Sequence, residues 1–238
     1  GLPPIAQRRL LGETDISPDG SFHISIPANT PIQLQTLDEN GLALRTCGWI
    51  WSKNAEPRGC IGCHEDGETT PENYFVDALK RPAVALTLPL ERRRTVDFRR
   101  DVMPVLERKC VGCHAQDGAP PRLDGGMTPA HPAGVFNRAY VSLLAPRDAS
   151  DPESVGGLYV HPGRARTSPL IWHLLGRDTS RPWDGELVQG QSVKPIPAGK
   201  VPPLTNLETR TFVEWVDLGA MWDGIPGPDE RSTSQPAD

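Results

Sequence analysis

Three segments near the N-terminus alternate apolar and polar residues with the period of two that is typical of half-buried β-strands. They span residues 21–26, 31–37 and 42–51. Turn-forming residues precede and separate them, at positions 18–20, 27–29 and 38–41. The pattern predicts a small antiparallel sheet or sandwich at the start of the chain.

From residue 95 onward the apolar residues recur at helical spacing instead. Three helices are expected: one that runs through Pro104 into Cys110, one that begins at Ser168-Pro169 and ends at Gly176, and one that begins at a Thr205/Glu208 capping box and ends at Gly219. Pro104 should kink the first helix or mark where its last turns restart. We therefore expect an α+β protein, with a small N-terminal antiparallel β domain followed by a loop-rich helical domain.

Two Cys-x-x-Cys-His motifs carry the chemistry of the chain. One is Cys60-Ile61-Gly62-Cys63-His64, and the other is Cys110-Val111-Gly112-Cys113-His114. Two thiols at this spacing capture the two vinyl groups of a haem as thioethers, and the adjacent histidine then reaches the iron. The motifs predict two covalently attached haem c groups, with His64 and His114 as iron ligands.

Cys-x-x-Cys pairs also occur in zinc sites with tetrahedral ligation. A histidine directly after both pairs favours haem over zinc. A disulfide framework is a weaker alternative, because the chain has only 5 cysteines in 238 residues. The fifth, Cys47, is open to three interpretations: it is buried and inert, it pairs with another chain, or it contacts the first haem.

The second axial position of each iron needs another ligand. His173 is the strongest candidate, because it lies on an apolar helical face where an unpaired imidazole would be costly, and His161 in an extended turn is the next. The weaker candidates are His131, His23, Met103, Met127 and Met221. A satisfied core histidine is the competing interpretation of His173.

These motifs divide the chain into four parts. Residues 1–64 form the β domain, residues 65–94 a linker that wraps the first haem, residues 95–225 a cytochrome c-like domain with the second haem, and residues 226–238 a disordered polar tail. The 26 prolines and 23 glycines favour loops over long helices, so buried haem would supply much of the apolar core.

The charge and the termini suggest where the protein works. A formal net charge of −5 argues against nucleic acid as a partner. No apolar run approaches the roughly 20 residues that cross a bilayer, so no transmembrane segment is expected. The chain begins at Gly1, which suggests a removed signal peptide or a longer precursor. Covalent haem attachment indicates a periplasmic or extracellular location.

Several segments together resemble one family. They are residues 11–13, 18–22, 26–28, 37–38, 60–65, 98–106 and 215–220. In these residues the chain resembles the haem-bearing middle and C-terminal part of the hydrazine synthase alpha subunit and its uncharacterised relatives. The resemblance implies a β domain with one haem and a cytochrome c domain with the other.

The resemblance does not by itself carry over enzyme activity. In the family's enzyme a tyrosine a few residues past the first motif serves the iron, and the motif histidine turns toward zinc. Glu68 stands at the equivalent spacing here, and the nearest tyrosine is Tyr74. The Met-Pro-Pro segment of many related domains is also absent, since Val201-Pro202-Pro203 lies in that stretch. That absence favours ligation by two histidines and a lower reduction potential.

Two functions follow from these motifs. The first is electron transfer between redox partner proteins, with both irons closed by protein ligands, and with other copies or subunits of a larger cytochrome assembly as further partners. The second is a haem enzyme, with peroxidase-like or nitrogen-compound chemistry at one open iron. Tyr74, His23 or another chain remain options for the first haem's distal side.

Overall fold

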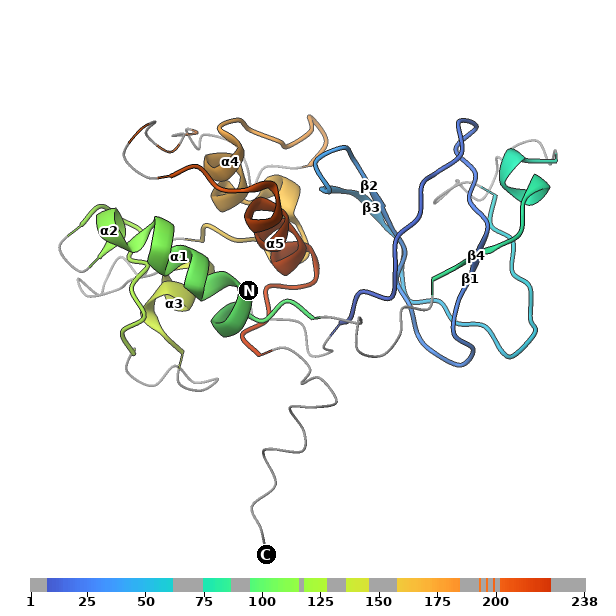
Figure 1. The fold of residues 1–238 in the computed structure, drawn as a ribbon, viewed down its shortest axis with the longest axis horizontal. Helices are drawn as coiled ribbons and strands as arrows, with labels where there is room; N and C mark the ends of the chain where they lie inside the picture. Colours follow the sequence, from blue (N-terminus) through green and yellow to red (C-terminus); the bar gives the residue numbers. More distant parts are fainter. Residues whose placement is uncertain are drawn as a thin grey trace, which may run out of the picture. The chain divides into compact units, whose positions relative to one another are not determined.

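The protein is described by a computed structural model, which combines small sheets with short helices in an α+β fold (Figure 1). It describes residues 8–61, 75–86, 95–115, 118–127, 136–145, 158–184, 193, 196, 199 and 202–223. The chain divides into two compact units. The helical unit contains residues 1–9, 37–43 and 95–226, and the β unit contains residues 10–36, 44–94 and 227–238.

Strand pairing among the described residues includes a parallel pair, which differs from the antiparallel sheet or sandwich that alternation predicts. β1 (Ile24–Ser25) pairs in parallel with β4 (Val84–Ala85), which comes from the segment expected to be a linker. β2 (Gln35–Leu37) pairs with β3 (Ala43–Thr46) in a separate sheet (Figure 1). Local alternation predicts that a segment is extended, but it does not specify which strand it meets.

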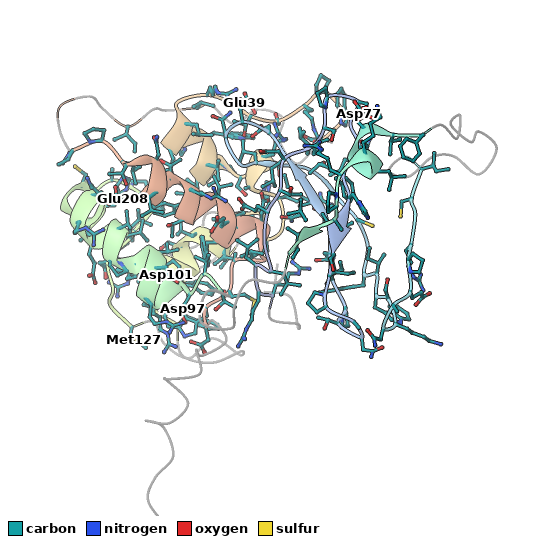
Figure 2. The ribbon with its side chains drawn as sticks, turned by 45° about the vertical axis from the view of Figure 1, so that its right-hand side comes forward. Glu39, Asp77, Asp97, Asp101, Met127 and Glu208 are labelled. Atoms are coloured by element: carbon teal, nitrogen blue, oxygen red, sulfur yellow. The ribbon has the colours of Figure 1, made fainter. Side chains whose placement is uncertain are left out.

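The β unit buries little apolar surface of its own. Among its described residues, the buried apolar side chains are Ile32 and Ala78. Polar contacts hold its short helix η1 (Asp77–Lys80) in place, since Asp19 Oδ2 accepts from the Asp77 amide at 2.8 Å. Figure 2 shows Asp77 on this helix. The unit therefore depends on hydrogen bonds rather than on a large core.

The first helical segment begins with a π-helical turn, η3 (Phe98–Val102), and continues as α1 (Met103–Lys109). Asp97 caps it, because its side chain accepts from the amides of Arg99 at 2.8 Å and Arg100 at 3.1 Å. Pro104 lies in the first turn of α1, where a missing amide hydrogen costs nothing. The α-helix starts at Met103, directly before the proline, which agrees with the prediction that the last turns of the helix restart near Pro104. Asp97 is labelled at this end of the helix in Figure 2.

The remaining helices of the unit are α2 (Val111–His114), α3 (Arg138–Leu144), η4 (Ala165–Thr167), α4 (Pro169–Leu175) and α5 (Asn206–Asp217). α4 ends at Gly176 in the left-handed conformation, with φ of 67°, as its sequence predicts. The predicted capping box of α5 is present, with Thr205 and Glu208 bonded to each other's backbone. Helix α3 was not predicted, and Asn137 caps it by accepting from the Tyr140 amide at 2.9 Å.

Aromatic rings form the centre of the helical unit. Phe98 lies 5.2 Å from Trp215 and 5.1 Å from Tyr140 between ring centroids. Both Phe98 and Trp215 are fully buried. These contacts join η3, α3 and α5, so the segment before the second motif is packed against helices from later in the chain.

Residues 37–43, the tip of the β2–β3 hairpin, belong to the helical unit. Leu42 has no exposed surface and is part of the helical core. Asp217 at the end of α5 accepts from the Ala43 amide at 3.1 Å and from the Ala165 amide at 2.7 Å. Burial raises the pKa of Asp217, although both amide bonds oppose the rise. The hairpin tip is thus anchored by one apolar and several polar contacts.

Replacing Leu42 with alanine should lower the free energy of unfolding by about 2–4 kcal/mol, because it leaves a cavity in the helical core. Leu44, which lies two residues later in β3 and is 37% exposed, provides the matched control. Leu44→Ala should cost less than about 0.5 kcal/mol. Urea titration followed by tryptophan fluorescence measures both values, and equal costs would contradict the insertion of Leu42 into the core.

Candidate functional site

The second Cys-x-x-Cys-His motif follows α1 directly and forms the short helix α2. Cys110 joins the two helices: its amide donates to the Leu106 carbonyl at 2.8 Å. Its own carbonyl accepts from the amides of Cys113 and His114, both at 3.0 Å. This turn holds the two cysteines and the histidine of the motif in one compact segment.

Both thiols of the motif are free in the structure. Cys110 is half-buried and Cys113 is exposed. Burial, with a smaller contribution from the neighbouring Cys113, raises the pKa of Cys110 to about 11. Cys110 is therefore a protonated thiol at neutral pH in the absence of a bound group.

His114 is held in one tautomer by backbone carbonyls. Its Nδ1 lies 2.9 Å from the Ala119 carbonyl oxygen and 3.0 Å from that of Pro121. Carbonyl oxygens only accept, so Nδ1 carries the proton and donates it. Nε2 is therefore the ring nitrogen that is left to bind a metal ion.

The loop after the motif closes tightly on the motif itself. The Ala119 amide donates to the Cys113 carbonyl at 2.9 Å, and the Leu123 amide donates to the His114 carbonyl at 2.8 Å. A Cβ atom at Gly118 would lie 2.2 Å from the Cys113 carbonyl oxygen, so only glycine fits there. This loop presents the two carbonyls that orient His114.

No group of three or more His, Cys, Asp or Glu side chains among the described residues could hold a metal ion.

Among the described residues of the helical unit, His161 is the buried histidine, with 9% of its surface exposed. Its Nδ1 lies 3.1 Å from the Thr167 hydroxyl oxygen, and that hydroxyl donates to the Arg164 carbonyl. Because the hydroxyl has one proton, His161 Nδ1 must be the donor in the first bond. Nε2 is buried and has no hydrogen-bond partner. Burial, and then the charge of Arg164, lower the pKa of His161, which favours the neutral ring.

The other proposed axial ligands have different surroundings. His173 on α4 is half-buried, with its ring centroid 6.5 Å from that of Tyr159. His23 Nδ1 lies 3.2 Å from the Arg81 carbonyl oxygen in the β unit. Met103 is 6% exposed, and its sulfur accepts from Asn137 Nδ2 at 3.4 Å. Met127 is 58% exposed, whereas the Met221 carbonyl accepts from the Trp215 indole at 2.9 Å.

The first motif lies only partly within the described residues. Cys60 is exposed and free. The expectations for Cys63, His64, Glu68, Tyr74 and His131 lie outside the described residues. Cys47 follows β3, is half-buried and forms no disulfide, and its amide donates to the Leu34 carbonyl at 2.8 Å.

Sequence patterns did not identify two residues that shape these sites. Gly118 lies in a Gly/Pro-rich loop where its special position is not distinguishable from that of other glycines. Thr167, six residues after His161, forms a hydrogen bond with its Nδ1. No sequence motif predicts the conformation of the turn that brings the two residues together. Each acts through backbone geometry that appears only in three dimensions.

Comparison with known proteins gives a consistent result. The sequence profile described as hydrazine synthase alpha subunit middle domain matches residues 1–65. Hydrazine synthase subunit alpha of Kuenenia stuttgartiensis is 30% identical over 288 aligned residues, which cover 94% of this chain and 34% of that protein. The solved structure of Kuenenia stuttgartiensis hydrazine synthase matches with a TM-score of 0.69 and 28% identity, over 94% of this chain and 34% of that one.

This chain is homologous to the hydrazine synthase alpha subunit. The resemblance that the sequence motifs indicate is thereby confirmed at the level of homology. The chain spans about a third of the length of the relatives that it matches. Within the described residues, no helix is both long and apolar enough to cross a membrane.

Replacing Gly118 with alanine should destabilise the protein by about 1–3 kcal/mol, because the new Cβ atom overlaps the Cys113 carbonyl. Gly112, inside the same motif, has nothing within 4 Å of its Cβ position and serves as the control. Gly112→Ala should be neutral or slightly stabilising, since alanine is the better helix former. Chemical denaturation measures the free energy of unfolding of both variants. Equal values would mean that the loop can move away from the Cys113 carbonyl without a cost in stability.

Proposed function

We propose that the protein is a dihaem c-type cytochrome that carries electrons between redox partner proteins outside the cytoplasm. The observation that carries the proposal is the orientation of His114, whose Nδ1 lies within hydrogen-bond distance of two backbone carbonyls, so that Nε2 is the nitrogen left to bind iron. A histidine in this state, directly after a Cys-x-x-Cys pair, suits an axial ligand of a covalently attached haem.

The residues of the helical unit fit one such haem. Cys110 and Cys113 would form the two thioether bonds, and His114 would bind the iron. His161 is the better supported of the two distal candidates, because its Nε2 is buried, unprotonated and without a partner. His173 remains the second candidate. Haem supplies one-electron chemistry, and histidines on both sides of the iron would exclude other ligands. In this proposal the helical unit is a cytochrome c-like domain.

The β unit would carry the other haem through Cys60, Cys63 and His64, a set that rests on the sequence motif. A second observation supports it. The unit buries little apolar surface, yet it exposes several large apolar side chains: Phe22 (43%), Trp49 (46%), Trp51 (55%) and Phe75 (68%). A porphyrin is a large apolar plate that would cover part of such a surface.

The alternative function is catalysis at one open haem iron. Homology to a protein named as an enzyme subunit favours it, and so does the shortage of distal ligands in the β unit. The word subunit in that name also suggests assembly with other chains, which here would be redox partners or further copies. Periplasmic or extracellular residence is part of both proposals.

The ultraviolet-visible spectrum before and after carbon monoxide separates the two functions. An electron carrier with two closed irons should be low-spin in both oxidation states, and the gas should leave its reduced spectrum unchanged. A shift in about half of the haem absorbance would identify one open iron and favour the enzyme. A pyridine haemochrome assay of the same sample counts the haems, and absence of covalent haem would refute both functions.

His161→Ala should open the iron of the second haem, so that carbon monoxide binds where it did not bind before. The physical reason is that alanine provides no lone pair for the sixth position. His173→Ala is the matched variant and should leave the spectrum unchanged. Carbon monoxide titration of the reduced proteins measures both effects, and binding to the His173 variant alone would assign the distal position to His173 instead.

A further inference from the structure

Arg122 lies on the segment that orients His114, yet two nitrogens of its guanidinium group, Nε and Nη2, have no hydrogen-bond partner. Both of its sequence neighbours form hydrogen bonds with His114: the Pro121 carbonyl accepts from His114 Nδ1, and the Leu123 amide donates to the His114 carbonyl. The Nε and Nη2 atoms of Arg122 are buried and make no hydrogen bond. Buried cationic donors without acceptors are strongly unfavourable, so the arrangement indicates a missing acceptor.

The two unpartnered atoms define the chemistry of that acceptor. Nε and Nη2 lie side by side on one edge of the planar guanidinium, and their hydrogens point in the same direction. Two parallel donors at this spacing match the two oxygens of a carboxylate. Arg122 therefore presents a complete edge for bidentate binding of a carboxylate group.

Asp124 is the nearest acid on the same segment, but it is not that acceptor in the structure. Asp124 Oδ1 accepts from the Gly126 amide at 3.0 Å and from Arg138 Nη1 at 3.3 Å. Its other oxygen, Oδ2, is buried and also has no partner. Arg138 thus supplies the positive charge for Asp124, and the charge of Arg122 is left without a counterion among the described residues.

We propose that the Nε–Nη2 edge of Arg122 binds a propionate carboxylate of the haem attached at Cys110 and Cys113. The inference rests on the proposed function, because that haem is the source of the carboxylate. His114 and Arg122 belong to one closed loop, so both would act on the same haem. Arg122 is then a positioning residue, and its positive charge beside the porphyrin favours the reduced iron.

The test is the midpoint potential of the second haem in Arg122→Gln, measured by spectroelectrochemical titration. Loss of the charge should lower the ratio of reduced to oxidised haem at a fixed potential by about tenfold, which corresponds to about 59 mV for one electron. Arg122→Lys keeps the charge but loses the paired donors, so its midpoint potential should lie between those of the wild-type protein and Arg122→Gln. Arg108→Gln is the control, because Arg108 is 58% exposed and carries the same charge in the same unit.

The outcomes separate this inference from the proposed function. If the wild-type protein carries no haem at the second motif, both are refuted. If haem is attached and Arg122→Gln has the potential of Arg108→Gln, only the inference is overturned. Should the glutamine variant not fold, the ¹⁵N resonance of Arg122 Nε in the wild-type protein decides: it should shift when the haem is reduced, and an unchanged resonance overturns the inference.

Discussion

The hydrogen bonds from His114 Nδ1 to two backbone carbonyls are the constraint on which the second site depends. They exist because residues 118–123 fold back onto the motif, and that closure requires Gly118. A free imidazole would exchange between two tautomers and several orientations. The closed loop removes that freedom before any metal arrives, so the ring is already prepared to bind one.

The helical unit can maintain this loop because it has a core of its own. Phe98 and Trp215 are packed together at its centre, so α1 and the motif behind it are held by α5 from the far end of the sequence. The β unit has no comparable core among its described residues, and it exposes several aromatic side chains. The two units therefore differ in the source of their stability. The helical unit holds its site by packing, whereas the β unit is suited to gain stability from a bound apolar group or a partner.

Two of the buried, unpartnered polar groups in the helical unit support the same interpretation as the motif. His161 has a buried nitrogen without a partner, and Arg122 has a buried donor edge without an acceptor. Folded proteins rarely leave such groups unsatisfied, because each costs free energy. The lone pair of His161 is complementary to a haem iron, and the donor edge of Arg122 is complementary to a haem propionate. Both residues lie in the unit that contains Cys110 and Cys113. This agreement supports the proposed function independently of the motif.

The sequence alone determined the elements that depend on neighbouring residues: the two Cys-x-x-Cys-His motifs, the capping box of α5 and the end of α4 at Gly176. Each is a short-range pattern in which the interacting residues lie a few positions apart. Only the tertiary structure decided the parallel pairing of β1 with β4, the insertion of Leu42 into the helical core, and the unpartnered state of His161 and Arg122. These features depend on contacts between distant segments and on burial of single atoms, and residue order does not encode either one locally.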